Sequence, residues 1–188
     1  MPMPALPEDL SRLSLAEIAD LAAQHRLPPV DQWAPTRFGH SEMRIARDGR
    51  WYHQGGLISR ENMVRLFSSI LRRDPDGRHY LVTPVEKLEI EVEDAPFIAV
   101  EVKSEGAGKD RRLAFRLNTG DLIVAGPDHR LQFEDLAGEP HPLLEVRGGM
   151  QALVSRAAYY ALADWALAED QDPVGLWSNG AFFPMAAA

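Results

Sequence analysis

The sequence predicts an α+β fold in which a small β-hairpin–helix domain precedes an antiparallel β domain that ends in a long helix. Three observations support this prediction. Two short runs of strand-forming residues flank Asp48-Gly49 and lead into an apolar stripe with helical spacing. Apolar and polar residues alternate with period two through much of residues 80–146, which is typical of half-exposed antiparallel strands. After residue 149 the apolar period changes to 3.6, which predicts a helix of about 20 residues.

Length and composition limit the classes of protein that the chain can represent. It has 188 residues with a formal net charge of −8, and 45% of its residues are hydrophobic, as expected for a soluble globular protein. The absence of cysteine excludes disulfide scaffolds, thiolate zinc sites, iron–sulfur clusters and cysteine nucleophiles. No run approaches the ~18 uncharged apolar residues of a membrane span, and residues 1–9 lack the basic start of a signal peptide. A cytoplasmic location is therefore expected.

Residues 1–32 are expected to form an N-terminal helix and an extended connector. Ser14 is the expected N-cap, and Glu17 completes a capping box three residues later. Pro28-Pro29 stops the helix, and the chain that follows is polyproline-like. We expect this helix to be a peripheral arm.

Residues 33–79 are expected to form the hairpin–helix domain. Asp48-Gly49 favours a two-residue type I′ turn between strands at 43–47 and 51–54. Ser59 is the expected N-cap of the helix that follows.

Residues 80–170 are expected to form about seven short strands and a closing helix. Leu88, Ile90 and Val92 alternate with glutamates, so that strand should bury one face. The polar residues 104–111 are expected to form a mobile loop. This order of elements resembles a pleckstrin-homology-like (PH-like) β-sandwich or barrel with a long C-terminal helix. Residues 171–188 form an aromatic tail that should pack back on the body.

The chain contains a pattern that suggests internal duplication. Strand, turn, strand and helix occur at residues 43–54 with the helix after Ser59, and again at residues 112–125 with the helix after residue 149. A repeat is therefore a hypothesis.

Charge is distributed unevenly along the chain. Residues 41–80 carry a net charge of +3 and all eight of their basic residues are arginines, whereas residues 81–110 carry −5. The planar guanidinium group binds phosphate or carboxylate through two parallel hydrogen bonds, so this segment is a candidate anion site. A general preference for arginine over lysine in the proteome is the alternative explanation.

No catalytic or metal-binding motif is visible in the sequence. The six histidines form no His-x-His or His-Glu-x-x-His pattern, and no Gly-x-Ser-x-Gly occurs. We therefore expect no catalytic residue, metal, cofactor or enzymatic activity. Because the arginine-rich hairpin lies in an acidic protein, nucleic acid is not expected as a partner.

A series of short motifs resembles, in matching order, the bacterial domain-of-unknown-function family DUF1285. The motifs lie at residues 43–51, 56–60, 66–67, 80–87, 94–97 and 177–180, and the resemblance spans about Trp33 to Pro184. It implies a duplicated core, a PH-like C-terminal domain, a ligand site at the interface between domains, a nucleotide-like ligand and a role in signal transduction. His40 and Glu42 depart from the family pattern, so no role is carried over to them.

The leading prediction is a non-enzymatic regulatory protein that binds a small anionic, nucleotide-like ligand at the interface between domains. We expect arginines to contact the anion, a tryptophan to stack on a ring, and polar residues near the domain boundary and on the C-terminal elements to complete the site. These residues are Arg44, Arg47, Arg65, Trp51, Thr83, Glu86, Lys87, Arg156, Tyr160 and Asn179. The alternative is a protein-interaction adaptor or homodimer module that uses the PH-like domain and the aromatic tail.

Overall fold

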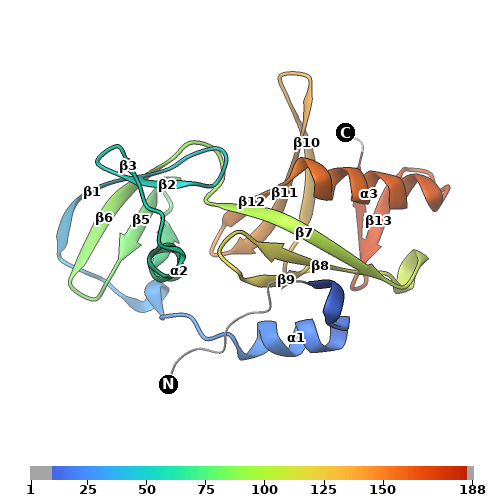
Figure 1. Ribbon diagram of the computed structural model, residues 1–188, viewed down its shortest axis with the longest axis horizontal. Coiled ribbons are helices and arrows are strands. Elements are labelled where there is room, and N and C mark those ends of the chain that lie inside the picture. The colour runs from blue at the N-terminus through green and yellow to red at the C-terminus, as the bar shows by residue number, and fades with distance from the viewer. Residues whose placement is uncertain (1–9, 186–188) are drawn as a thin grey trace. The chain divides into compact units, whose positions relative to one another are not determined.

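The computed structural model describes residues 10–185 (Figure 1). These residues are mostly β structure with three α-helices, which confirms a mixed α+β fold. They form two compact units. The N-terminal unit comprises residues 26–96 with 148–150, and the C-terminal unit comprises residues 10–25, 97–147 and 151–185. None of the helices in this described part is long and apolar enough to cross a membrane.

The N-terminal unit contains a six-stranded sheet in the order β3-β2-β1-β6-β5-β4. Its strands are β1 (Arg37–Ile45), β2 (Trp51–His53), β3 (Gly56–Leu57), β4 (Leu71–Arg73), β5 (His79–Val82) and β6 (Glu86–Val92). The central strands β1 and β6 are parallel, and the other pairs are antiparallel. The short helix η2 (Val30–Gln32) precedes the sheet, and α2 (Glu61–Ser69) connects β3 to β4. Strands β5 and β6, which the expected boundary after residue 79 placed in the second domain, thus pair within the first sheet.

Two local predictions in this unit are wrong. Only Gly49 of Asp48-Gly49 has a positive φ, of 87°, whereas a type I′ turn needs two such residues. The N–H of Gly49 donates to the Ala46 carbonyl at 2.9 Å, so the hairpin has a longer loop with glycine at its left-handed position. The N-cap of α2 is Arg60 rather than Ser59. The backbone still pairs at Ile58, whose N–H donates to Trp51 at 2.8 Å, and the helix begins later.

The core of the N-terminal unit lies between α2 and one face of the sheet. Trp51 is 1% exposed and stacks on Phe67 of α2, with ring centroids 6.5 Å apart. Ile45 and Leu71 are fully buried on this face, and Ile90 is almost fully buried there. The hairpin and the helix are therefore held together by one aromatic pair on an aliphatic sheet.

His79 on β5 is a half-buried histidine whose charged neighbour is a cation. Its Nε2 is buried and has no hydrogen-bond partner, and its cross-strand neighbour is Arg73. Burial, followed by repulsion from Arg73, lowers the pKa of His79 to about 4. The folded unit therefore holds this ring in its neutral form at neutral pH.

The C-terminal unit contains a second six-stranded sheet in the order β10-β11-β12-β7-β8-β9. Its strands are β7 (Phe97–Glu105), β8 (Arg112–Leu117), β9 (Leu122–Val124), β10 (Leu131–Leu136), β11 (Glu139–Arg147) and β12 (Met150–Val154). Here too the first and sixth strands, β7 and β12, are the parallel pair in the centre.

The two sheets share one connectivity, which indicates a duplicated domain. Each consists of two three-stranded meanders whose first and last strands meet in parallel. The repeat therefore aligns β1–β6 with β7–β12, and the hairpin β1–β2 corresponds to β7–β8. The second copy expected at residues 112–125 corresponds to β8–β9. It begins one strand later than the true equivalent of β1–β2, which is β7–β8.

Helix α1 (Leu15–Gln24) packs against β8 and β9 (Figure 1). The predicted capping box of Ser14 and Glu17 is confirmed. The expectation of a peripheral arm is wrong, because the helix and the preceding η1 (Leu10–Arg12) supply fully or almost fully buried residues to the core. The buried members of this cluster are Leu10, Leu15, Ile18, Ala114 and Leu122.

Helix α3 (Arg156–Ala168) is shorter than predicted, because residues 150–154 form β12 instead of its first turns. Ala152 and Val154 are buried and pair with β7, so the apolar spacing in this stretch serves a strand. Ser155 caps the helix by accepting the Ala158 N–H at 3.3 Å. The helix packs against β7 and β13 (Figure 1).

The chain ends in the hairpin of β13 (Gly175–Ser178) and β14 (Ala181–Pro184). The hydroxyl of Ser178 is fully buried, accepts the Leu113 N–H at 2.9 Å and donates to the Ala125 carbonyl at 2.7 Å. One serine thus fastens the hairpin to β8 and to the end of β9.

The segment expected to be a mobile loop, which contains η3 (Gly108–Asp110), is also fastened. Arg111 is 7% exposed, forms an ion pair with Glu169 and donates to Ser104 at 2.5 Å. Its carbonyl accepts the Asn179 N–H at 3.1 Å. The loop is therefore part of the packed unit.

Substitution of Ser178 by alanine should destabilise the protein by about 1–3 kcal/mol, because it leaves a buried N–H and a buried carbonyl without partners. The free energy of unfolding from urea titration checks this. Ser69→Ala is the control, since its hydroxyl bonds only within α2, and it should change stability by less than about 0.5 kcal/mol. Equal effects of the two variants would contradict the role of Ser178.

Substitution of His79 by glutamine should reduce the loss of stability in acid. Because the folded-state pKa of His79 is lowered to about 4, the unfolded chain takes up a proton first as the pH falls below the ordinary value of 6.5. His79 therefore costs stability progressively between these two values, by about 1 kcal/mol after allowance for solvent screening of a partly exposed ring. Urea titrations at pH 7 and pH 4.5 measure this. A pH dependence that is the same in both proteins would exclude this role of His79.

Candidate functional site

The predicted site residues of the N-terminal unit lie in two groups at opposite ends of β6. Lys87 pairs with Phe38 near the start of the strand, whereas Arg44 pairs with Glu91 near its end. At ~3.3 Å per residue, these two positions are ~13 Å apart. The structure therefore does not bring the predicted residues of this unit into one site.

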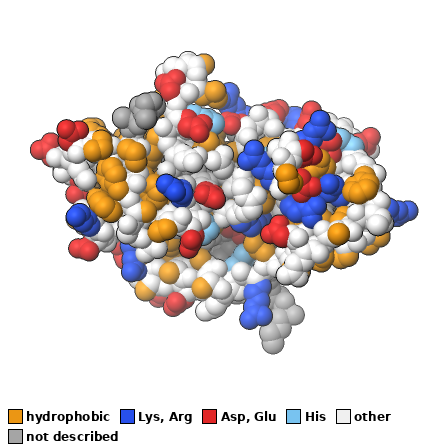
Figure 2. All heavy atoms as spheres, turned by 180° about the vertical axis from the view of Figure 1, so that it is seen from behind, with side chains coloured by type: hydrophobic (Ala, Val, Ile, Leu, Met, Phe, Trp, Pro, Cys, Tyr) orange, Lys and Arg blue, Asp and Glu red, His pale blue; other side chains and the backbone are white. Residues whose placement is uncertain are grey.

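Arg44 and Arg47 are each engaged with a carboxylate. Arg44 forms an ion pair with Glu93, and its guanidinium lies 4.5 Å from the centre of the Tyr52 ring. The Arg47 N–H donates to the same Glu93 at 2.8 Å, and its Nε lies 3.5 Å from Asp94. Acidic and basic side chains are similarly interspersed on the face drawn in Figure 2. An incoming anion would have to compete with carboxylates that are already in place.

Trp51 cannot stack on a ligand in this structure, so its expected role is wrong. The ring is 1% exposed and lies against Phe67. Trp51 pairs with Ile45, which follows Arg44 in β1. Because neighbouring residues of a strand point to opposite faces, the side chains of Trp51 and Arg44 lie on opposite faces of the sheet. Arg65 is half-buried in α2.

Glu42, next to the arginine-rich strand, forms a bulge in β1. Its φ is 57°, and the register of β1 with β6 shifts between His40 and Arg44. His40 Nδ1 accepts the Glu42 N–H at 2.8 Å, and Gln54 Nε2 donates to the Glu42 carboxylate at 2.6 Å. His40 and Gln54 thus stabilise the bulge at Glu42.

Thr83 and Glu86 lie at the turn between β5 and β6. The Thr83 hydroxyl accepts the Glu86 N–H at 3.1 Å and the Val85 N–H at 3.3 Å. Thr83 therefore stabilises the turn that places Lys87 at the start of β6.

Lys87 is the centre of a compact charged cluster. Its Nζ donates to Asp74 at 2.8 Å, and Arg72 Nε donates to the same carboxylate at 2.7 Å. Partial burial raises the pKa of Asp74, but the hydrogen bonds from Arg72 and Lys87 outweigh it and the net shift is downward. Two cations thus share one carboxylate, which leaves the cluster with a net charge of +1.

Phe38 is a functional candidate that sequence reasoning missed. It is 71% exposed, and Lys87 Nζ lies 5.3 Å from the centre of its ring and 4.4 Å from that of Tyr80. We call Phe38, Tyr80 and Lys87 the aromatic platform. No local pattern identifies it, since Phe38 and Lys87 meet only through the parallel pairing of β1 with β6.

The remaining predicted residues belong to the C-terminal unit. Arg156 is exposed in the first turn of α3, and Tyr160, one turn later, is 58% exposed. Asn179 adopts a positive φ of 48° in the turn between β13 and β14, where its N–H donates to Arg111. The structure thus gives Asn179 a role in the turn. Within residues 10–185, no group of three or more histidine, aspartate or glutamate side chains could hold a metal ion.

Comparison with known proteins identifies similar chains. Residues 28–95 match the N-terminal domain, and residues 96–185 the C-terminal domain, of a family described as a domain or protein of unknown function (DUF1285). No curated protein matches the chain.

Two solved structures resemble the protein. A DUF1285 family protein from Silicibacter pomeroyi DSS-3 is 45% identical, with 89% of this chain and 93% of the other covered and a TM-score of 0.78. A DUF1285 family protein from Shewanella baltica OS155 is 27% identical, with 65% and 90% covered and a TM-score of 0.51.

Proposed function

The chain belongs to the DUF1285 family, and we propose that this member is a non-enzymatic regulatory protein that binds a small anionic ligand carrying a ring, as a nucleotide does. Phe38 and Lys87 take the stacking and anion-binding roles first expected of Trp51, Arg44 and Arg47. A PH-like C-terminal half and a role in signal transduction are further parts of this proposal, since the family resemblance implies them.

The observation that carries the proposal is the aromatic platform. Phe38, the second residue of β1, is 71% exposed and therefore gains little stabilisation from burial. Its ring face is available to stack on the ring of a ligand. Lys87 holds an ammonium beside that ring, at 5.3 Å from its centre.

The remaining donors of Lys87 suit an anion, and the other polar member of the platform, Tyr80, donates to the carboxylate of Asp76. An ammonium group has three N–H donors, and Lys87 uses one of them on Asp74, so two remain for phosphate or carboxylate oxygens. Arg72 shares the charge of Asp74 and donates to the carbonyls of Val30 and Trp33, each at 2.9 Å. Because that carboxylate serves two cations, Lys87 retains part of its attraction for a ligand.

A thermal-shift panel of nucleotides and cyclic nucleotides, with inorganic phosphate as the ring-free probe, tests the proposal. A ligand at 100 times its Kd should stabilise the protein by about 2.7 kcal/mol. Phe38→Ala and Lys87→Gln should each remove that stabilisation. The controls Leu167→Ala and Lys109→Gln, which lie in the other unit, should keep it.

Two results would overturn the proposal. One is the absence of any shift across the panel at millimolar concentration. The other is a shift of equal size in the wild type, Phe38→Ala and Lys87→Gln. If inorganic phosphate is the only probe that stabilises the protein, and it does so equally in Phe38→Ala, the stacking role of Phe38 is excluded.

The second candidate function is the interaction module or homodimer. It is favoured by Tyr160 and Leu167, which are 58% and 66% exposed and lie seven residues apart, on one face of α3. If this face forms a homodimer, the double variant Tyr160→Ser/Leu167→Ser should be monomeric by light scattering, while Val85→Ser, at a position 61% exposed in the other unit, stays dimeric. A monomeric wild type would exclude the homodimer.

A further inference from the structure

A small cavity opens within the C-terminal unit, and none of its lining residues belongs to the aromatic platform. It has a volume of about 100 Å³ and lies between the hairpin β10–β11, helix α3 and the end of the chain. The residues that line it are Phe133, Glu134, Asp135, Pro140, His141, Pro142, Tyr159 and Met185. This volume suits one functional group rather than a drug-sized ligand.

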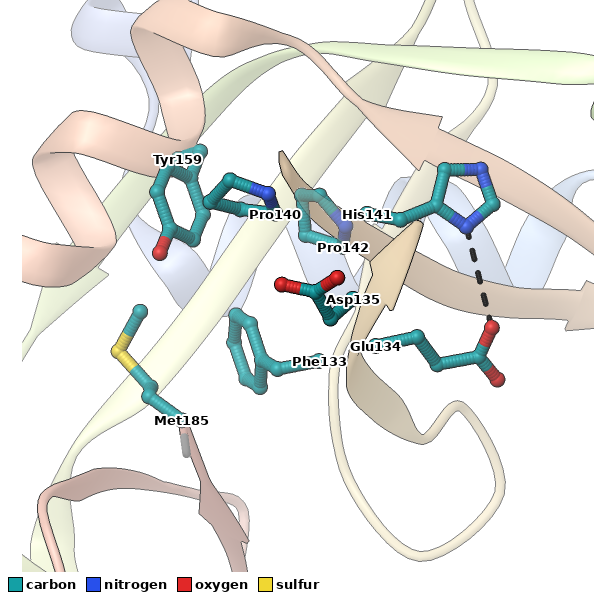
Figure 3. A pocket seen from close by; sticks show the side chains of 8 residues that line it. All are labelled: Phe133, Glu134, Asp135, Pro140, His141, Pro142, Tyr159 and Met185. Carbon is teal, nitrogen blue, oxygen red and sulfur yellow. Dashed lines mark ion pairs between the residues drawn. The ribbon is translucent and has the colours of Figure 1, made fainter. Parts of the chain in front are cut away.

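The hairpin divides these residues between its two faces. Phe133 pairs with Pro142 and Asp135 with Pro140, whereas Glu134 pairs with His141 on the opposite face. Figure 3 shows the same division, with the Asp135 carboxylate among Phe133, Pro142 and Tyr159, and Glu134 reaching instead toward His141. The Glu134 carboxylate lies 3.8 Å from His141 Nδ1.

The cavity therefore combines the rings of Phe133 and Tyr159 with one carboxylate, that of Asp135, which is exposed to solvent. Phe133 and Tyr159 lie with ring centroids 6.4 Å apart and planes tilted by 50°, so they form two sides of a corner. The thioether of Met185 faces the same space (Figure 3). Asp135 accepts one hydrogen bond, from the Gly138 N–H at 2.8 Å, and this contact involves only one of its two oxygens.

The hairpin also attracts cations through its charge. Residues 131–147 contain four acidic residues and one basic residue, a net charge of −3 with histidine neutral. Aromatic faces attract ammonium groups through their quadrupole, and a carboxylate adds a direct charge interaction. The carboxylate repels anions. An apolar solute would contact the rings and prolines but would gain nothing from the carboxylate.

We infer that this cavity is a binding site for an organic ammonium group, with Asp135 as the counter-charge and Phe133 and Tyr159 as the aromatic walls. The chemistry is shared by a methylated or primary ammonium on a small molecule and by a lysine side chain of a polypeptide. The site is separate from the aromatic platform, whose proposed ligand has the opposite charge.

The experiment uses calorimetric titration of the full chain with choline and with its neutral isostere 3,3-dimethylbutan-1-ol. Choline should bind at least about tenfold more tightly than the isostere, because the two differ in charge and not in shape. Asp135→Asn should weaken choline binding by about three- to fivefold, the effect of losing an exposed charge pair, while its amide oxygen still accepts the Gly138 N–H. Glu134→Gln is the matched control one residue away on the other face and should bind choline within twofold of the wild type.

Equal binding of choline and the isostere would overturn the inference, and so would an Asp135→Asn variant that binds like the wild type. No detectable binding of choline or of a trimethyllysine peptide at millimolar concentration would also overturn it. Both probes should shift the ring resonances of Phe133 and Tyr159 in NMR spectra. Tighter binding of the peptide than of choline assigns the site to a polypeptide partner, and the reverse order assigns it to a small molecule.

Discussion

In both units the first and last strands of a six-stranded sheet lie side by side in parallel, and the other strands are placed by this pairing. β1 with β6, and β7 with β12, join residues about 50 positions apart in the chain. Each central strand then carries a meander outward to one edge. The pairing sets which side chains meet across the sheet centre, and it brings Phe38 beside Lys87.

The buried polar groups hold the loops of the C-terminal unit to its sheet. The Ser178 hydroxyl bonds to two backbone groups that have no partner within the sheet. The Arg111 side chain forms an ion pair with Glu169, and the Arg111 carbonyl accepts the Asn179 N–H. These are residues of the motif at 177–180 and of the loop before β8. Part of the sequence that resembles the family therefore serves the fold, so the resemblance alone does not locate a ligand site.

Charge compensation decides where a ligand could bind. The arginine-rich hairpin has a positive excess in the sequence, but Arg44 and Arg47 meet Glu93 and Asp94, which come from the segment with the negative excess. At the other end of β6 two cations share Asp74, and an exposed ring lies beside one of them. These ion pairs join residues that are distant in the sequence. Glu93 lies 49 residues from Arg44 and 46 from Arg47, and Asp74 lies 13 residues from Lys87.

Features that depend on residues close together in the chain could be predicted from the amino-acid sequence: the mixed α+β class, the capping box of α1, the alternation in β6 and the absence of cysteine chemistry. The strand order, the strand identity of residues 150–154, the burial of Trp51 and the exposure of Phe38 became known from the fold. The two groups differ in the sequence separation of the interactions that produce them. Capping and periodicity act within one or two turns of chain, whereas sheet pairing and burial depend on segments that are distant in sequence, and a short apolar run fits a strand as well as a helix until its partner is known.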